Sequence, residues 1–287
     1  MSYYEALGLT TEPFSTSPDP AFFYLSKEHK AALFRLRIAI ELKRGLSVIV
    51  GDVGTGKTTL SRKLAQELRE EPEIALYMIL NPFFKSQKQF LSRLAALFHV
   101  ELAPGKTTGL DCMEAIEQFL YRKGIHEQKT IVLLLDEAQL LPDYVLEILR
   151  ILLNYETNEF KILQLILLGQ MELLPRISRL SNFWDRIALK YVLNPLDLNE
   201  TKEVISFRLR QAGSNGEVFF TDRALGVIHE YTRGYPRKLS LLCHNSLESL
   251  VMQDKKIVDE AVVRDLIAKD IQPLTIETRG GIPDVIQ

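Results

Sequence analysis

The sequence predicts an α/β fold, in which a parallel five-stranded sheet is covered by helices and followed by a small C-terminal helical domain. Short apolar segments alternate with amphipathic helical segments up to about residue 193. After Pro195 the strand signal disappears, and only helical patterns follow. Strands that are apolar throughout, rather than alternating with polar residues, are typical of a parallel sheet buried on both faces. A small domain of packed helices accounts for the second part.

The expected elements follow from these patterns in chain order. The strands are short, mainly aliphatic runs, too short to be helices of ordinary length. Ser26 is expected to cap the first long helix, and Thr221 is expected to cap a helix of the second part. The strands are expected at 46–50, 74–80, 130–135, 162–168 and 187–193. The helices are expected at 26–44, 58–69, 86–98, 111–122 and 145–155, and then at 199–211, 221–233, 236–252 and 259–269.

These elements give four expected regions. An N-terminal segment, 1–25, is rich in prolines and aromatics. The α/β domain is expected over 26–196, and a helical lid domain is expected over 197–270. The last residues, 271–287, contain two prolines, two adjacent glycines and few apolar anchors, which predicts a flexible tail.

Composition places the chain among ordinary soluble proteins, with 46% hydrophobic and 25% charged residues. Lys plus Arg number 35 against 37 for Asp plus Glu, so any surface for nucleic acid must be local. Cys112 and Cys243 are too few for a disulfide framework. The N-terminus lacks the pattern of a secretory signal, and no apolar run is long enough to cross a bilayer. We therefore expect a cytoplasmic protein without direct membrane insertion.

A phosphate-binding loop follows the first strand and opens the next helix. The stretch from Gly51 to Thr58 matches the pattern G-x-x-x-x-G-K-[ST] in full. Its glycines let backbone N–H groups surround phosphates, and the helix N-terminus adds partial positive charge. Lys57 is expected to bridge the outer phosphates of ATP, and the Thr58 hydroxyl to ligate Mg²⁺. The residues expected to bind the nucleotide are Gly51, Asp52, Val53, Gly54, Thr55, Gly56, Lys57, Thr58 and Thr59.

Two carboxylates follow the strand 130–135 at its end. In open α/β sheets ligands bind outside the carboxyl ends of the strands, so this position suits catalytic groups. Asp136 is expected to hold the magnesium ion, directly or through water. Glu137 is expected to polarise the water that attacks the γ-phosphate. Together with the loop at Lys57, the pair predicts hydrolysis of ATP to ADP and phosphate.

Motifs along residues 3 to about 268 resemble those of the AAA+ ATPases of the ExeA/GspA secretion type. The most specific are Asp136-Glu137-Ala138-Gln139 and Gly169-Gln170-x-Glu172-Leu173. The other matching residues are Tyr4-Glu5, Leu7-Gly8-Leu9, Pro13-Phe14, Pro18-Asp19-Pro20, Tyr24-Leu25-Ser26, the loop Gly51 to Thr59, Asn81-Pro82, Arg186-Ile187 and Gly234-x-Pro236-Arg237. The resemblance implies an AAA+ P-loop NTPase fold.

The resemblance also implies roles for three further residues. Gln170 would be a sensor that contacts the γ-phosphate or the attacking water, and Arg237 would reach the phosphates from the helical domain. Arg186 would be the arginine finger that reaches the ATP of a neighbouring subunit. Arg176 and Arg179 lie nearby in the sequence and are rivals for this last role. Trp184, the only tryptophan, suits either an interface or the core.

The resemblance leaves two kinds of partner open. Longer secretion-type members are understood to carry a membrane span and a cell-wall-binding domain after the ATPase, and this sequence, up to Gln287, carries neither. The same module also resembles target-selecting transposition ATPases of the TnsC/TniB type. Both readings imply ATP, Mg²⁺ and a homo-oligomer, either a ring or a filament. The first reading adds a secretion component as partner, and the alternative adds a transposase and duplex DNA.

Two aromatic segments carry further expectations. Phe14, Phe22, Phe23 and Tyr24 are expected to pack on the ATPase domain beside the adenine, with a neighbouring subunit as the alternative. In AAA+ rings the segment after the second strand faces the central channel, which here is the segment 81–88. Its aromatics and lysines suit either a polypeptide or phosphates, and burial of the aromatics in the core is the third possibility.

Overall fold

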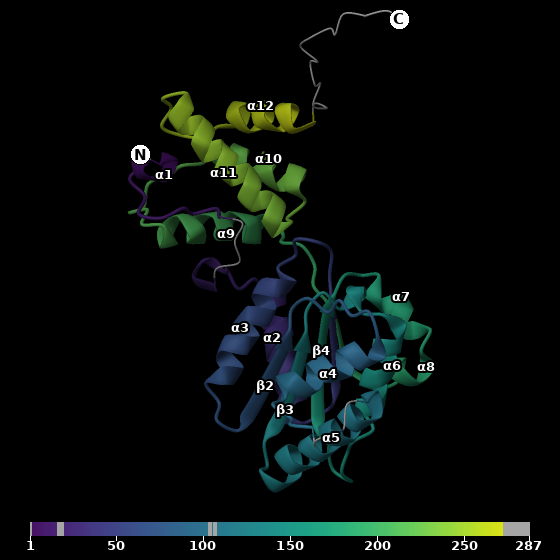
Figure 1. Cartoon of the computed structure of the whole chain (residues 1–287). Coiled ribbons are helices and arrows are strands. Elements are labelled where there is room, and N and C mark those ends of the chain that lie inside the picture. The colour runs from purple at the N-terminus through teal and green to yellow at the C-terminus, as the bar shows by residue number, and fades with distance from the viewer. Residues whose placement is uncertain (1, 16–19, 103–104, 106–107, 272–287) are drawn as a thin grey trace, which may run out of the picture. The chain divides into compact units, whose positions relative to one another are not determined.

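The computed structural model describes residues 2–15, 20–102, 105 and 108–271 (Figure 1). Contacts group the chain into two compact units. The sheet unit consists of Ser17–Leu196 with Tyr235–Arg237. The helical unit consists of Met1–Thr16, Asp197–Gly234 and Lys238–Gln287. The expected flexible tail falls almost entirely outside the described residues.

The sheet unit is built on five strands that all pair in parallel. Their order across the sheet is β2-β3-β4-β1-β5, so β1 lies between β4 and β5. The register pairs Val50 with Gly169 on one side of β1 and with Val192 on the other. The strands are β1 (Leu46–Val50), β2 (Ile74–Ile79), β3 (Thr130–Leu135), β4 (Leu163–Gly169) and β5 (Ile187–Val192).

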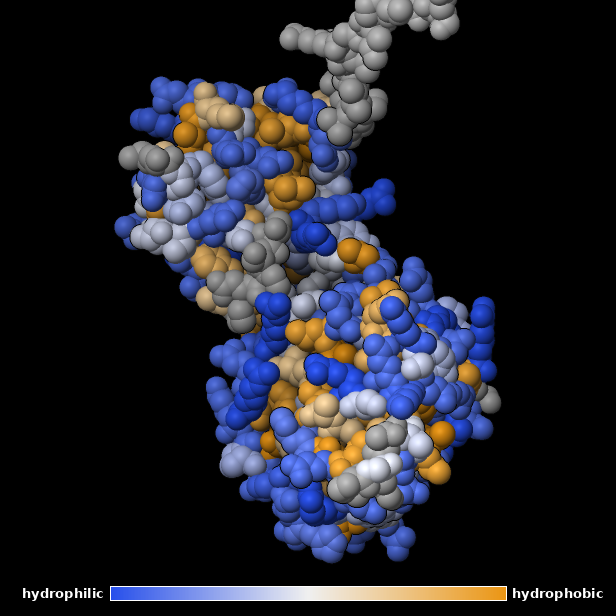
Figure 2. Space-filling model, in the orientation of Figure 1, coloured by the Kyte–Doolittle hydropathy of each residue, from blue (hydrophilic) through white to orange (hydrophobic). Residues whose placement is uncertain are grey.

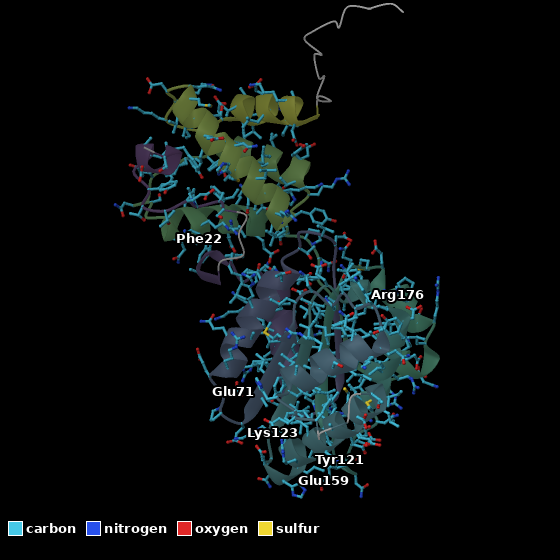
Figure 3. The ribbon with its side chains drawn as sticks, viewed as in Figure 1. Phe22, Glu71, Tyr121, Lys123, Glu159 and Arg176 are labelled. Carbon is cyan, nitrogen blue, oxygen red and sulfur yellow. The ribbon has the colours of Figure 1, made fainter. Side chains whose placement is uncertain are left out.

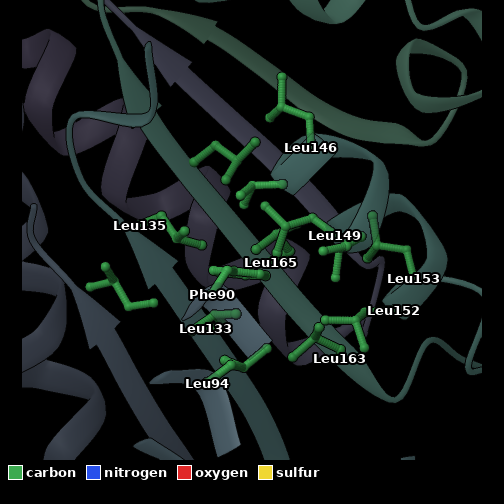
Figure 4. Packing of buried hydrophobic residues seen from close by; sticks show 14 of the residues in the cluster. Phe90, Leu94, Leu133, Leu135, Leu146, Leu149, Leu152, Leu153, Leu163 and Leu165 are labelled. Carbon is green, nitrogen blue, oxygen red and sulfur yellow. The ribbon is translucent and has the colours of Figure 1, made fainter. Parts of the chain in front are cut away.

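Alternate residues of the central strands supply two separate cores. Residues such as Ile49, Val132 and Ile166 pack with the helices α2 and α3 on one face. Residues such as Leu133 and Leu165 pack with α4, α5 and α6 on the other. Figure 4 shows leucines of β3 and β4 pointing toward Phe90 and Leu94 of α4 and toward the leucines of α6. Because both faces are covered, β1, β3 and β4 are almost entirely apolar, as the sequence predicted.

The long helices of the sheet unit lie within a few residues of the expected ranges. The short elements were not expected, because four to six residues carry too little periodicity to be recognised. A π-helical turn, Arg122–His126, also extends the end of α5. The helices are α2 (Lys27–Glu41), α3 (Lys57–Arg69), α4 (Gln87–Leu97), α5 (Gly109–Tyr121), α6 (Asp143–Leu152), α7 (Leu173–Ser178) and α8 (Ser181–Trp184), with 3-10 turns at Pro20–Phe22 and Ala138–Leu140.

The helical unit begins with a capping box, in which the Asp197 side chain accepts from the Glu200 N–H and the Glu200 side chain accepts from the Asp197 N–H. The Thr221 side chain accepts from the Ala224 N–H, as expected of an N-cap. The unit contains α9 (Leu198–Gln211), α10 (Asp222–Thr232), α11 (Pro236–Met252) and α12 (Glu260–Ile271). A short helix α1 (Tyr3–Ala6) near the N-terminus belongs to the same unit.

The first part of the N-terminal segment packs differently from our expectation. Phe14 is 1% exposed and meets Phe220 edge-on within the helical unit, with ring centroids 6.3 Å apart. Thr10 donates both its backbone N–H and its hydroxyl to the Ala212 carbonyl, at 2.8 and 3.0 Å. The prediction that Phe14 packs on the ATPase domain beside the adenine is therefore wrong. The aromatic composition correctly indicated a packed segment, but it carries no information about which unit supplies the surface.

The α/β fold class, with its five-stranded parallel sheet and the helices that follow it, is confirmed by the strand pairing and the element order. No helix within the described ranges is long and apolar enough to cross a membrane. The surface seen in Figure 2 is largely hydrophilic, with hydrophobic residues showing between hydrophilic ones.

Candidate nucleotide-binding site

The predicted phosphate-binding loop runs from the end of β1 to the start of α3. Gly54 and Gly56 have φ angles of +85° and +95°, a backbone region that side chains with a Cβ atom rarely adopt. A Cβ atom on Gly56 would also come within 2.8 Å of the His29 Nε2 atom. Glycine at position 56 is therefore required both by the backbone conformation and by the close approach of α2. Gly56 is also the N-cap of α3, so the first N–H groups of this helix face the loop.

Lys57 points back into the loop. Its Nζ donates to the carbonyl oxygens of Gly51 and Asp52, at 2.7 and 2.8 Å. Burial lowers the pKa of this ammonium group, while the nearby carboxylates of Glu137, Asp136 and Asp52 act in the opposite direction. Phosphates would supply the negative charge that the buried ammonium lacks.

Asp136 follows β3 and is 2% exposed. Burial raises the pKa of its carboxyl group, and hydrogen bonds from the Thr58 side chain and the Glu137 backbone N–H partly offset this effect. The contact between Thr58 and Asp136 joins the start of α3 to the end of β3. The expected magnesium ligands are thus brought together.

These two oxygen donors fit Mg²⁺, which usually takes one or two protein ligands and fills its octahedron with water and substrate phosphates. Among the residues that the structure describes, no group of three or more His, Cys, Asp or Glu side chains gathers as a dedicated metal site. The donor set therefore suits an ion that arrives with phosphates better than a permanently bound one.

Glu137 lies next to Asp136 in a left-handed backbone conformation, with φ of +53°. Such a conformation is uncommon for a residue other than glycine and turns the side chain away from the path of the strand. Its backbone N–H donates to the Asp136 Oδ1 at 2.9 Å, which stabilises the bend. The Glu137 carboxylate accepts a hydrogen bond of 2.6 Å from the Gln139 side chain. Gln139 belongs to a sequence motif, but nothing in the sequence indicates this contact with Glu137.

His29 is a second residue near the loop that the sequence did not reveal. It is 2% exposed, and its Nε2 lies 3.1 Å from the Thr55 carbonyl oxygen. Because a carbonyl oxygen only accepts, Nε2 carries the proton, and the Ser26 hydroxyl, 2.6 Å from Nδ1, donates to the other nitrogen. Phe23 meets the imidazole edge-on at 4.9 Å between ring centroids. This part of the N-terminal segment therefore braces the phosphate-binding loop through His29.

Gln170 and Arg237 both lie close to the candidate site. Gln170 follows β4, and its backbone N–H donates to the Gln139 Oε1 at 3.0 Å. Arg237 is exposed, and its backbone N–H lies 3.4 Å from the Gly54 carbonyl oxygen, within the sheet unit. The adjacent Tyr235 donates its hydroxyl to Asp52 at 2.6 Å. The structure thus brings the region of Arg237 to the loop, and Tyr235 is a further contact that sequence reasoning missed.

Arg186 has no described contact with the residues of the loop. Its Nε donates to the Asn182 carbonyl at 3.1 Å, and its Nη1 is buried without a hydrogen-bond partner. The rival Arg176, on α7 (Figure 3), is engaged within its own chain, since it donates to the carbonyls of Gln139 and Leu141 and pairs with Asp143.

The other residues near Arg186 have different environments. Arg179 is exposed. Trp184 is partly buried against the core, and Lys190 lies 3.6 Å over its ring.

A family model described as "AAA domain" matches residues 40–177. These residues form an AAA domain. General secretion pathway protein A of Aeromonas hydrophila is 37% identical over 247 residues, which cover 85% of this chain and 44% of that protein. The resemblance to the ExeA/GspA type is therefore confirmed, although the chain spans less than half the length of this relative.

Solved structures share the fold of the AAA domain and the helices that follow it. Cdc6p of Pyrobaculum aerophilum matches with a TM-score of 0.64 at 15% identity, covering 86% of this chain and 67% of that one. The ORC1 protein of Aeropyrum pernix, solved in complex with DNA, matches with a TM-score of 0.62 at 15% identity, covering 90% and 69%. The RuvB branch migration motor of Thermotoga maritima matches with a TM-score of 0.54 at 20% identity, covering 84% and 68%. At these identities the matches establish the AAA+ fold and nothing about partners.

Proposed function

We propose that this protein binds ATP with Mg²⁺ at the loop Gly51–Thr59 and hydrolyses it to ADP and phosphate. The observation that carries the proposal is the convergence of Lys57, Thr58, Asp136 and Glu137, which come from the start of α3 and the end of β3. These are the groups that hydrolysis needs: a cation on the phosphates, two oxygen donors for the metal ion and a carboxylate for the water.

Each residue then has a distinct task. On binding, Lys57 would leave the carbonyls of Gly51 and Asp52 for the β- and γ-phosphates, which offer stronger, charge-assisted hydrogen bonds. Thr58 and Asp136 would hold the magnesium ion, which would neutralise the charge that develops on the phosphates. Glu137 would accept a hydrogen bond from the water and orient it in line with the γ-phosphate. Gln170 and Arg237 would contact the same phosphates from the end of β4 and the start of α11.

We further propose that the working form is a homo-oligomer, with Arg186 completing the site of a neighbouring subunit. The Nη1 atom of Arg186 is buried without a hydrogen-bond partner. A buried donor without an acceptor lowers the free energy of unfolding. Because Nη1 is enclosed by its own chain, Arg186 would change its rotamer to bring this donor to an acceptor on a neighbouring subunit or on its ATP. The engagement of Arg176 with Gln139, Leu141 and Asp143 favours Arg186 over this rival.

A secretion-type role with a protein partner is our first choice for the biological task, because of the 37% identity to General secretion pathway protein A. The segment after β2 is a candidate contact surface. Phe83 is 70% exposed, whereas Phe84 is buried against Phe90, so only one of the two aromatics is free to grip a polypeptide. Burial in the core, the third possibility for these aromatics, therefore holds for Phe84 and not for Phe83.

A transposition-type role on duplex DNA is the second candidate. It is favoured by exposed cations beside Phe83, namely Lys85, Lys88 and Arg93. If DNA is the substrate, ATP-dependent binding should weaken steeply with salt, and Lys85→Ala with Lys88→Ala should flatten the slope of log K against log salt by about one to two units. Absence of DNA binding at low salt with an ATP analogue would eliminate this candidate.

The ATPase proposal is tested by Lys57→Ala, which removes the cation from the phosphates. We expect ATP binding or hydrolysis to be abolished, as measured by phosphate release and by titration with a fluorescent ATP analogue. Lys63→Ala is the matched control, because Lys63 lies on the same helix and forms a partly exposed ion pair with Glu67, at 3.6 Å. Equal turnover by Lys57→Ala and the wild type would refute the proposal.

A further inference from the structure

The side chain of Gln139 connects the proposed catalytic carboxylate to the end of a neighbouring strand. Its Nε2 donates to the Glu137 Oε2 at 2.6 Å. Its Oε1 accepts from the backbone N–H of Gln170, directly after β4, at 3.0 Å. One planar amide group therefore holds the Glu137 carboxylate and the Gln170 backbone in a fixed relation.

The backbone of Gln139 is itself held in place. Arg176 donates from Nη1 to the Gln139 carbonyl at 2.6 Å, and from Nη2 to the Leu141 carbonyl and the Asp143 carboxylate. Gly169 permits the close approach, because a Cβ atom there would lie 3.2 Å from the Gln139 Oε1 and 2.9 Å from the Leu173 Cδ2. The backbone that carries the amide is thus anchored from α7.

We propose that Gln139 is a positioning residue, which sets the orientation of the Glu137 carboxylate and couples it to the strand end that carries Gln170. This inference rests on the proposed ATPase function. The hydrogen bond engages Oε2 and leaves Oε1 to accept from water. Because the same amide is bonded to the Gln170 backbone, a shift of that backbone on contact with phosphate moves the carboxylate as well.

The left-handed backbone at Glu137 makes such a restraint necessary. A carboxylate on a sharp bend has several accessible rotamers, and only some of them place an oxygen beside the water. A misplacement of about 1 Å in a reacting group can lower a rate about a hundredfold. A positioning role therefore predicts a loss in kcat rather than in ATP affinity.

The test compares two variants of Gln139 with a matched control. Gln139→Met keeps the length of the side chain and removes both hydrogen bonds. Gln139→Glu keeps an acceptor for the Gln170 N–H but replaces the donor to Glu137 with a second negative charge. We expect kcat to fall about tenfold or more for both, with the dissociation constant for an ATP analogue within about twofold of wild type.

Gln164→Met is the control, because the side chain of Gln164, on β4, also bridges two backbone groups. It accepts from the Gly45 N–H at 2.8 Å and donates to the Lys161 carbonyl at 2.7 Å. This variant should lower the unfolding temperature without changing kcat. If Gln139→Met and Gln164→Met lower the unfolding temperature equally and neither changes kcat, Gln139 has only a structural role and the proposal is overturned.

A double-mutant cycle separates this inference from the proposed function. If Gln139 acts through Glu137, adding Gln139→Met to Glu137→Gln should lower the residual rate by less than twofold. Independent, multiplicative losses would overturn the positioning role while leaving Glu137 as the catalytic carboxylate. Undiminished hydrolysis in Glu137→Gln alone would instead overturn the assignment of Glu137, and the role of Gln139 with it.

Discussion

The carboxyl edge of the sheet and the N-terminal part of the helical unit both bury residues completely, but they bury different kinds of groups. At the sheet edge, Lys57 and Asp136 are 6% and 2% exposed, although each side chain is ionisable. In the helical unit, the apolar residues Leu9 and Phe14 are 4% and 1% exposed, and Phe14 meets Phe220 edge-on. Burying an apolar side chain contributes about 1.5–3 kcal/mol to folding, whereas burying a charge opposes folding unless a partner compensates it.

This contrast distinguishes residues that serve ATP hydrolysis from residues that stabilise the fold. Burial lowers the pKa of the Lys57 ammonium group and raises the pKa of the Asp136 carboxyl group, so neither charge is in its preferred environment. Phosphates and Mg²⁺ would supply the missing counter-charges. Substitutions at the sheet edge should therefore change hydrolysis more than stability, and substitutions at Phe14 should do the reverse. The predictions below test this separation, in decreasing order of their effect on hydrolysis.

The largest effect is expected for Glu137→Gln. The amide keeps the size of the side chain but is a much weaker acceptor for the attacking water. ATP binding should be retained and hydrolysis should slow at least about a hundredfold, with the unfolding temperature little changed. Single-turnover phosphate release under saturating ATP measures the effect, and Glu172→Gln, an exposed carboxylate in the same unit, is the control. Wild-type turnover would remove Glu137 from the mechanism.

A smaller loss is expected for Arg186→Ala, because the residual site keeps its carboxylates and metal ion. The variant should bind ATP normally and hydrolyse it at least about tenfold more slowly. Wild-type activity per subunit should rise with protein concentration if the arginine acts on a neighbour. Arg179→Ala serves as the comparison, since it removes the exposed rival. Loss of activity in Arg179→Ala alone would reassign the finger, and activity independent of concentration would argue against a site shared between subunits.

A modest effect is expected for His29→Ala. The change removes the hydrogen bond to the Thr55 carbonyl and so releases the phosphate-binding loop from α2. A hydrogen bond of this kind contributes about 0.5–1.5 kcal/mol, so ATP affinity should fall about two- to tenfold. The dissociation constant for an ATP analogue is the measurement, and exposed His99→Ala is the control. Unchanged affinity in a folded His29→Ala protein would show that the loop holds its shape without this brace.

The smallest effect on hydrolysis is expected for Phe14→Ala, although its effect on stability should be large. Truncating a fully buried phenylalanine costs about 3–5 kcal/mol of unfolding free energy. Chemical denaturation should report that loss in the transition of the helical unit, while ATP affinity below the transition stays near that of wild type. A large drop in ATP affinity without loss of stability would break the separation between the two regions and revive the adenine-side placement of this residue.

The sequence was informative where function requires a continuous stretch of chain. The loop Gly51–Thr59 and the pair Asp136 and Glu137 are local patterns, and the surrounding strand and helix are set by the same residues. The class of fold followed from the apolar strands, because a sheet covered on both faces leaves no alternation along β1, β3 and β4.

Other parts of the site depend on contacts between distant parts of the chain, which no local pattern reports. His29 is separated from Thr55 by 26 positions, and Gln139 from Gln170 by 31. The position of Phe14 depends on Phe220, which follows all five strands of the sheet in the sequence. Short elements such as α7 were missed because one and a half turns show no periodicity, yet α7 supplies Arg176.

The division of the helical unit into separate stretches has a consequence for the order of events during synthesis. Residues 2–15 are synthesised before the strands of the sheet unit, but Phe220, which packs against Phe14, is synthesised after them. The sheet strands can therefore fold while Leu9 and Phe14 are still exposed. Exposed apolar segments of nascent chains are sites of aggregation. A fragment that begins at Asp197 would likewise lack residues 2–15, which belong to the same unit. The two units are therefore best produced as one chain, since the helical unit draws on residues that precede the sheet strands and on residues that follow them.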